Sequence, residues 1–492
     1  MTTRGNRKAK NSACSKLSIG WASRDITPDR KVVLGAQHKM RISEGVDGSV
    51  TVNVLALSAG AAADEAVIFV SCDLGSFRHY WYERNDFLVL VRESIRERDP
   101  AIDVERVILN ATHTHTAPNS LNGRYGDAAP EGVMTADEYM EFLRVRIAEA
   151  VVEAWNGRRP GGVSYGLGTA LVGHNRRVTY FSADSTRKGG STVNGHTRMY
   201  GNTNSPDFSH IEGYEDHYVD LLYTWASDGA LTGVVVNLAC PSQETEMAMR
   251  ISADFWHEVR TEIRKRHGER IQVLAQCAAA GDQSPHRVWY EAAEARMLKL
   301  RGLTMRQEIG RRVANAVDDV LPAARTDIRH TVPLKHVVRI LHLPRRMVTE
   351  AEAEAAREDL AKLEAEAASG VNNYRLLRPC RRVLERYEDQ KDTPLIPMTL
   401  HVVRLGDIAF ATNRFELFLD FGIRMKARSP AVQTFVVQLA ANVGWTGNYL
   451  PSERAVANLG YGSSVYNSEI GPEGGQVIVE ETVKALNELW EK

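Results

Sequence analysis

The feature that most constrains the fold is the apolar run Val107-Ile108-Leu109, which leads directly into a polar segment containing His113 and His115. Such a run predicts a buried strand. Because side chains alternate across a strand, a spacing of two predicts that both imidazoles leave on the same face. Imidazole is the commonest protein ligand for zinc, so we interpret this strand end as a candidate metal site. Two histidines hydrogen-bonded within a polar turn are the alternative interpretation.

Other periodic segments predict sheets packed with helices. Predicted strands cover residues 50–57 and 66–72 as an antiparallel pair, 233–239, 272–275, and 401–404 with 408–411 as a hairpin that turns at Gly406. Helical periodicity covers residues 135–155, 254–266 and a final segment with Val479, Val483, Leu486 and Trp490. We therefore expect a mixed α/β (α+β) fold with mixed and antiparallel sheets packed against helices.

Residues 347–390 are predicted to form a charged helical hairpin inserted in this fold. Thr349 and Glu352 have the spacing of a capping box, and an alanine- and glutamate-rich stretch follows them. The basic stretch around Arg381 and Arg386 predicts a returning second helix. A lid, an oligomer contact and a solvated insertion all stay open as roles for this hairpin.

Composition limits the classes of function. The chain has 492 residues, of which 43% are hydrophobic and 25% charged, as is ordinary for a globular protein. We expect one large catalytic domain, residues 18–492, after a disordered basic tail, residues 1–17. A net charge of −1 gives no electrostatic footprint for nucleic acid. The expected partner is a small-molecule substrate, and a homo-oligomer stays open.

The sequence also indicates a location. No window approaches the ~20 apolar residues of a membrane span, and no apolar stretch of a secretory signal follows the basic N-terminal residues. The five cysteines are odd in number and lack motif spacing, which argues against a disulfide framework. We therefore expect a reducing, cytoplasmic setting.

The histidine segment also carries a family resemblance. Thr112-His113-Thr114-His115-Thr116-Ala117-Pro118 closely resembles the Thr-His-Thr-His-Ser-Gly-Pro signature of the neutral, non-lysosomal ceramidase family, with Thr and Ala replacing Ser and Gly. The members of this family are zinc-dependent amidases. The resemblance covers residues 18–492 patchily, and it implies a ceramidase-like catalytic domain with His113 as a zinc ligand.

Two further ligands are implied by the same resemblance. Glu416 ends Asn-Arg-Phe-Glu, which resembles the family's Gly-Glu-Phe element with its zinc-binding glutamate. Tyr449 and Tyr461 are twelve residues apart, as expected of two active-site tyrosines in the family, the first bound to zinc and the second contacting substrate. From the residues alone, an exposed glutamate at a helix start and structurally buried phenols are the alternatives.

The remaining family ligand, a histidine before a proline, is replaced here. Cys240 stands at that position, before Pro241. Because a thiolate binds zinc well, we predict Cys240 as the fourth ligand. A small buried cysteine is the alternative, in which case His210, Glu244 or His217 would supply the ligand.

The resemblance implies catalytic roles for two residues, and general acid–base chemistry suggests one for a third. Ser284 lies in Gly-Asp-Gln-Ser-Pro, which resembles the family's Gly-Asp-x-Ser-Pro loop at the reaction centre and would bind the developing oxyanion. Arg176, in an Asn-Arg element, would hold the substrate oxygen, with a surface ion pair as the alternative. His115 would take the proton of the attacking water and pass it to the departing amine.

The sequence thus predicts a zinc-dependent hydrolase of an amide bond in an unidentified small substrate. A water-soluble substrate is expected rather than ceramide, because no apolar insertion provides a pocket for lipid tails. A glycosidic or ester bond is an alternative. A non-catalytic binding protein on the same fold is favoured by Cys240 and disfavoured by both tyrosines, Glu416 and Ser284. A serine hydrolase is less favoured because Ser284 lacks a Gly-x-Ser-x-Gly frame.

Overall fold

The computed structural model describes residues 15–37, 39–60, 63–77, 87–121, 129–183, 195–369, 374–443 and 448–491. Most of the expected basic tail, residues 1–14, lies outside the described residues. Its last residues, 15–17, belong instead to the first strand, where Ser15 and Lys16 pair with Val332 and Thr331. Order therefore begins before residue 18, because backbone pairing holds this end of the chain in a sheet.

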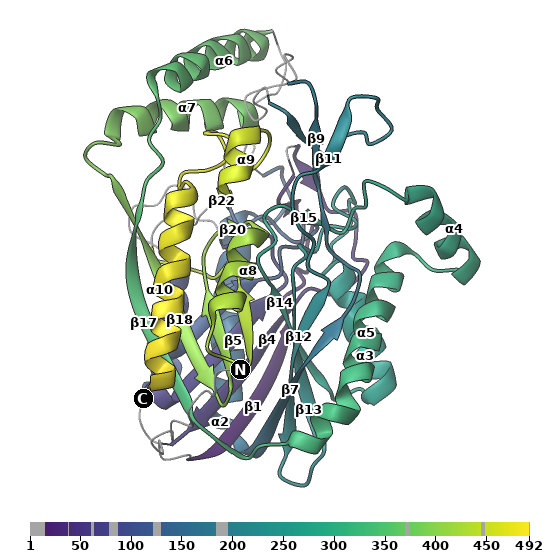
Figure 1. The fold of residues 1–492 in the computed structure, drawn as a ribbon. Helices are drawn as coiled ribbons and strands as arrows, with labels where there is room; N and C mark the ends of the chain where they lie inside the picture. The colour runs from purple at the N-terminus through teal and green to yellow at the C-terminus, as the bar shows by residue number, and fades with distance from the viewer. Residues whose placement is uncertain are drawn as a thin grey trace, which may run out of the picture.

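The larger sheet is mixed (Figure 1). Its strands follow the order β14 (Gln272–Cys277), β13 (Leu231–Leu238), β12 (Tyr218–Ala226), β7 (Arg159–Thr169), β1 (Ser15–Asp25), β4 (Thr51–Ala59), β5 (Ala66–Cys72) and β6 (Val107–Ala111), and β16 (Thr331–Val332) pairs with β1. The β5–β6 and β13–β14 pairs are parallel, and the predicted β4–β5 pair is antiparallel. The strands predicted at residues 50–57, 66–72, 233–239 and 272–275 are therefore confirmed.

A second sheet packs on the larger one. It follows the order β17 (Leu334–Pro344), β18 (Leu395–Leu405), β19 (Ile408–Thr412) and β21 (Gln433–Val437). The predicted hairpin is β18–β19, and Gly406 in its turn has a φ of 63°, which glycine adopts without strain. A core cluster joins the facing sides of the two sheets, including Leu55, Phe69 and Phe410.

Helices cover the outer faces of both sheets. Against the larger sheet pack α1 (Phe87–Arg98), α2 (Ala136–Asn156), α3 (Phe255–His267) and α5 (Met305–Ala324). Against the second sheet pack α8 (Leu419–Arg428) and α10 (Pro472–Glu491). The described residues thus stack as helices, sheet, sheet and helices, with α3 and α5 on the opposite side of Figure 1 from α8 and α10. The expected α/β (α+β) architecture is confirmed.

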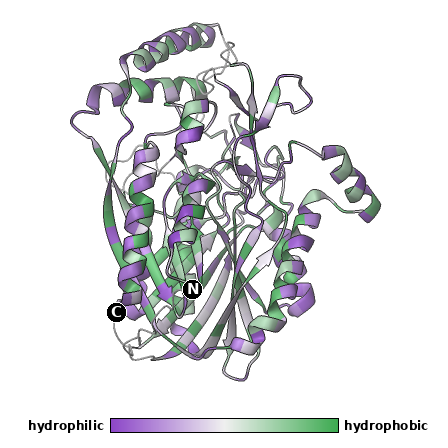
Figure 2. Cartoon of the chain, in the orientation of Figure 1, coloured by the Kyte–Doolittle hydropathy of each residue, from purple (hydrophilic) through white to green (hydrophobic). Residues whose placement is uncertain are grey.

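Local sequence explains where these helices begin. The Thr135 hydroxyl accepts from the backbone N–H of Glu138, and the backbone N–H of Thr135 donates to the Glu138 carboxylate, so the predicted capping box starts α2. In α10 the buried positions include Ile478, Val479 and Leu486, which share one face. Figure 2 shows hydrophilic and hydrophobic residues on the same helix, as expected when one side lies on a sheet and the other in solvent.

The predicted helical hairpin is formed by α6 (Glu350–Ala368) and α7 (Tyr374–Asp389). The Thr349–Glu352 capping box opens α6. The two helices are joined by an ion pair of 2.9 Å between Arg381 and Glu364. Figure 1 shows them at the same end of the molecule as the short helix α9 (Glu453–Asn458). None of the described helices is long and apolar enough to cross a bilayer.

Short elements complete the described fold. They are the strand pairs β2 (Val33–Leu34) with β3 (Arg41–Ile42), β8 (His174–Asn175) with β15 (Gln283–Ser284), and β20 (Glu416–Leu417) with β22 (Tyr449–Leu450), the sheet β10 (Thr197–Met199), β9 (Arg177–Tyr180) and β11 (Phe208–Ile211), and the helix α4 (Glu291–Arg301). Several of them carry predicted site residues.

Candidate functional site

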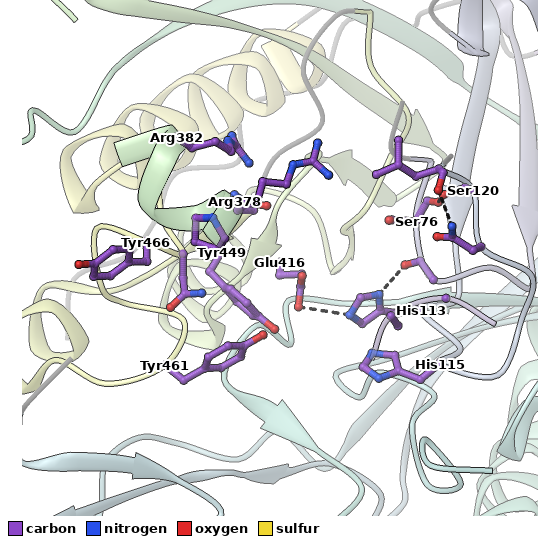
Figure 3. A pocket seen from close by; sticks show the side chains of 18 of the residues that line it. Ser76, His113, His115, Ser120, Arg378, Arg382, Glu416, Tyr449, Tyr461 and Tyr466 are labelled. Carbon is purple, nitrogen blue, oxygen red and sulfur yellow. Dashed lines mark hydrogen bonds and ion pairs between the residues drawn. The ribbon is translucent and has the colours of Figure 1, made fainter. Parts of the chain in front are cut away.

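A cavity of about 150 Å³ brings together residues far apart in the chain. Five of the eight predicted site residues line it, namely His113, His115, Glu416, Tyr449 and Tyr461. Figure 3 shows the two histidines on one side and the two tyrosines on the other, with Glu416 between them. The three predicted residues outside its lining are Arg176, Cys240 and Ser284.

The two imidazoles meet, but not by the predicted strand alternation. Strand β6 ends at Ala111, and His113 has a φ of 66°, in the left-handed region that non-glycine residues seldom adopt. The rings of His113 and His115 lie edge to face with centroids 4.9 Å apart. The predicted reason was therefore wrong, because a turn after the strand, rather than the strand itself, aims these side chains. Strained backbone of this kind is concentrated at functional sites.

His113 directs one ring nitrogen at a carboxylate. Its Nδ1 lies 2.5 Å from the carbonyl oxygen of Gly75, which can only accept, so Nδ1 carries the proton of the neutral ring. Its Nε2, which is unprotonated in that tautomer of the neutral ring, faces Glu416 Oε2 at 3.2 Å. Two acceptors facing each other are repulsive unless a proton or a cation lies between them.

Glu416 and Tyr449 are neighbours because of backbone pairing. They are direct partners in the parallel pair of β20 and β22, so their side chains leave side by side. Burial raises the pKa of the Tyr449 hydroxyl well above the usual range, and the neighbouring Glu416 carboxylate raises it as well. Arg176 donates to the Tyr449 hydroxyl at 3.1 Å and to the Gly281 carbonyl at 2.9 Å. Arg176 therefore holds Tyr449 from behind the cavity wall.

His115 is oriented by a carboxylate that the sequence did not reveal. Its Nδ1 lies 3.1 Å from Glu246 Oε2, and Gln37 donates to the same oxygen at 2.8 Å. The acceptor-only carboxylate assigns the proton to Nδ1, and the buried Nε2 has no hydrogen-bond partner among the residues that the structure describes. Burial, only partly offset by Glu246, lowers the pKa of His115 to about 4. The imidazole is therefore neutral at pH 7.

The donor set fits a zinc ion, the metal that the resemblance implies. Two ligand atoms that are each ~2.0–2.1 Å from zinc, at the tetrahedral angle, lie about 3.3 Å apart. The separation of 3.2 Å between His113 Nε2 and Glu416 Oε2 agrees with this value. No group of three or more histidine, cysteine, aspartate or glutamate side chains forms a metal cluster within the described ranges. The candidate set of His113, Glu416 and Tyr449 contains only two residues of these four types, and its third member is a tyrosine phenol.

Cys240 is not brought to the cavity. Its side chain is fully buried, and its Sγ donates to the neighbouring Pro241 carbonyl at 3.4 Å. Burial raises the pKa of this thiol well above its usual range. The three other candidates for its role do not line the cavity either: His210 is exposed on β11, His217 pairs with Glu215, and Glu244 lies 3.6 Å from His286.

Ser284 lies in a buried network beside the cavity. Its hydroxyl is 2.9 Å from the Tyr200 hydroxyl and accepts from Gln243 at 3.0 Å. The loop that carries it supports the site in another way, because a Cβ on Gly281 would lie 2.3 Å from the Glu416 carbonyl oxygen. Only glycine permits this approach. The Asp282 carboxylate then accepts from the backbone of Leu419 at 3.0 Å, which fixes the chain after β20.

Comparison with known proteins finds similar folds among solved structures. No protein-family model and no curated protein sequence matches the chain. Among solved structures, the neutral ceramidase from Pseudomonas aeruginosa superposes with a TM-score of 0.65 at 15% identity, over 97% of this chain and 75% of that one. A ceramidase complexed with C2 superposes with a TM-score of 0.64 at 15% identity, over 96% of this chain and 76% of that one.

The class defined by these superpositions is a ceramidase-like fold. The chain is a divergent representative of it, since so few residues are identical over nearly its whole length. The expected ceramidase-like fold is confirmed.

Proposed function

We propose that this protein is a zinc-dependent hydrolase of an amide (N-acyl) bond in a small substrate. The observation that carries the proposal is the separation of 3.2 Å between His113 Nε2 and Glu416 Oε2, with Tyr449 set beside Glu416 by the backbone pairing of β20 and β22. His113, Glu416 and Tyr449 would hold the ion, which leaves one position of a tetrahedral site for water. The ceramidase-like fold supports the reaction class.

The chain's own residues then move the protons. Bound zinc supplies Lewis-acid polarisation and lowers the pKa of water. His115 accepts a proton from the attacking water at Nε2, because Glu246 holds the proton of the ring on Nδ1. The same nitrogen returns the proton to the departing amine. Tyr461, whose ring centroid lies 5.4 Å from that of Tyr449, is placed to bind the substrate carbonyl.

Arg176 and Ser284 take supporting positions in this proposal. Arg176 orients the Tyr449 hydroxyl by donating to it, and Ser284 joins the network of Tyr200 and Gln243. Cys240 is left out of the ligand set because its thiol points into the core. Four described cysteines, Cys72, Cys240, Cys277 and Cys380, are free thiols, which supports the reducing, cytoplasmic location expected from the sequence.

Metal analysis combined with turnover tests the proposal. We expect about one zinc per chain in the purified protein, loss of hydrolysis of N-acyl compounds on chelation, and recovery on adding zinc. Glu416→Gln keeps the shape of the side chain and should lose both the metal and the activity. Arg428→Gln, at a surface ion pair with Glu480, is the matched control. A fully folded protein that hydrolyses these amides without metal would contradict the proposal.

A further inference from the structure

The second helix of the hairpin forms part of the cavity wall. Arg378 and Arg382 of α7 line the same cavity as His113 and Glu416. They are four residues apart, so both lie on one face of the helix. Figure 3 shows the side chains of both arginines on the α7 side of the cavity, which also carries Tyr449. From the sequence, a solvated and charged insertion is one possible role for this hairpin. In the structure, the hairpin contributes two cationic side chains to the lining of the candidate active site.

The hairpin is closed at its own base and is fixed to the rest of the fold through α7, so these arginines have a defined position. Gln390, just after α7, accepts from the backbone of Val348 at 2.7 Å and donates back to its carbonyl at 3.1 Å. Arg386, one turn beyond Arg382, donates to the carbonyls of Ser468 and Val465, both at 3.1 Å. A lid or a freely solvated insertion would not need such buried anchors.

Several arginines lie close together at this end of the cavity. Arg382 lies 3.9 Å from Glu469, a carboxylate that Arg345 already binds at 3.0 Å. Burial, against the opposing effect of Glu469 and together with Arg346, Arg345 and Arg382, lowers the pKa of Arg386 to about 10. Crowded arginines in a concave wall attract and orient an anion.

We propose that the substrate of this hydrolase carries an anionic group, a carboxylate or a phosphate, that Arg378 and Arg382 bind while the amide bond faces His115 and Glu416. The guanidinium fork matches both anions with paired hydrogen bonds. A lipid tail would instead need an apolar wall at this position. This inference rests on the proposed amide hydrolase function of the same site.

The first arm of the test measures turnover with matched substrates. N-acetyl amino acids are compared with their carboxamides, and N-acetyl amino sugars bearing a phosphate with the unphosphorylated sugars. We expect kcat/KM to favour one anionic series by ~10–100-fold, and the preferred series identifies the anion. Arg378→Gln with Arg382→Gln should remove this preference, mainly through KM, and the double lysine variant should restore part of it. Arg381→Gln is the control, since Arg381 is on the same helix but pairs with Glu364.

The second arm measures binding of inorganic phosphate and of acetate by titration calorimetry, without turnover. We expect the better-bound anion to weaken at least ~10-fold in the double glutamine variant, and to be unchanged in Arg381→Gln and in His113→Ala. Retention in His113→Ala separates the arginines from a metal-bound anion. If no amide is hydrolysed but the anion binds in this pattern, the hydrolase function fails and the anion site stands. Equal binding by wild type and the double variant, or no binding by wild type, overturns the inference, as does equal turnover of charged and uncharged substrates.

Discussion

The segments that follow strands β6 and β13 lie against each other, yet they contribute differently to the cavity. The segment after β6 turns at His113 and sends two imidazoles into it. The segment after β13 keeps Cys240 in the core and sends Glu246 behind His115. Ser242 joins the two segments by donating to the Thr112 carbonyl at 2.6 Å. One strand end thus supplies reacting groups, and the other supplies the groups that hold them.

This difference shows that closeness to the site does not define a ligand. Cys240 is only two residues before Ser242, which contacts the first segment. Its own thiol, however, donates to the Pro241 carbonyl and lies in the core. The positive φ at His113 turns that side chain away from the direction it would take if the strand continued. Substitutions in the two segments should therefore have effects that fall steeply from the first to the second.

Replacing His113 should have the largest effect. His113→Ala removes the nitrogen that faces Glu416, so we expect loss of zinc and a fall in turnover of more than ~100-fold, beyond the range for residues that only orient a ligand. Metal content and kcat measure the two losses. His210→Ala, at an exposed position on β11, should change neither. Full zinc content in His113→Ala would mean that the segment after β6 supplies no essential metal ligand, so the proposed difference between the two segments would not hold.

Replacing Glu246 should have an intermediate effect. Glu246→Gln keeps the shape of the side chain but weakens the hold on His115 Nδ1, so kcat/KM should fall ~10–100-fold while zinc content is unchanged. The neighbouring Glu244, which lies 3.6 Å from His286, gives the control Glu244→Gln. Equal effects of both substitutions would mean that the loss of turnover does not come from the contact of Glu246 with His115.

The sequence predicts the first segment well and the second poorly. The spacing of His113 and His115 after an apolar run is visible in the chain, and so are the strands and capping boxes that surround it. Glu246 contacts His115 across 131 residues, from a loop without periodicity. Such a contact depends on how β13 and β6 come together in three dimensions, which no local pattern encodes.

The same limit applies elsewhere in the site. Strands β20 and β22 are two residues long each, too short to show alternation, although their pairing sets Glu416 beside Tyr449. The hairpin shows the converse case. Its helices follow from capping and composition, but the sequence of α7 does not reveal that Arg378 faces a cavity while Arg381 faces α6.

Removing the link between the two segments should have a small effect. Ser242→Ala leaves the buried Thr112 carbonyl without this donor, which should cost about 1 kcal/mol of unfolding free energy. Turnover should fall only a few-fold, because the turn at His113 keeps its other contacts. Urea unfolding with parallel rate measurements gives both numbers. A loss of turnover as large as that of Glu246→Gln would show that this link positions the histidines.

Replacing Cys240 should leave the site unchanged. The thiol is fully buried, donates to the Pro241 carbonyl and does not line the cavity that holds the proposed ligands. Cys240→Ala should therefore retain zinc and turnover, and lose about 1 kcal/mol of unfolding free energy for the lost packing. Loss of zinc in Cys240→Ala, with the fold intact by circular dichroism, would instead mean that the segment after β13 rearranges around the metal and supplies a ligand as the segment after β6 does.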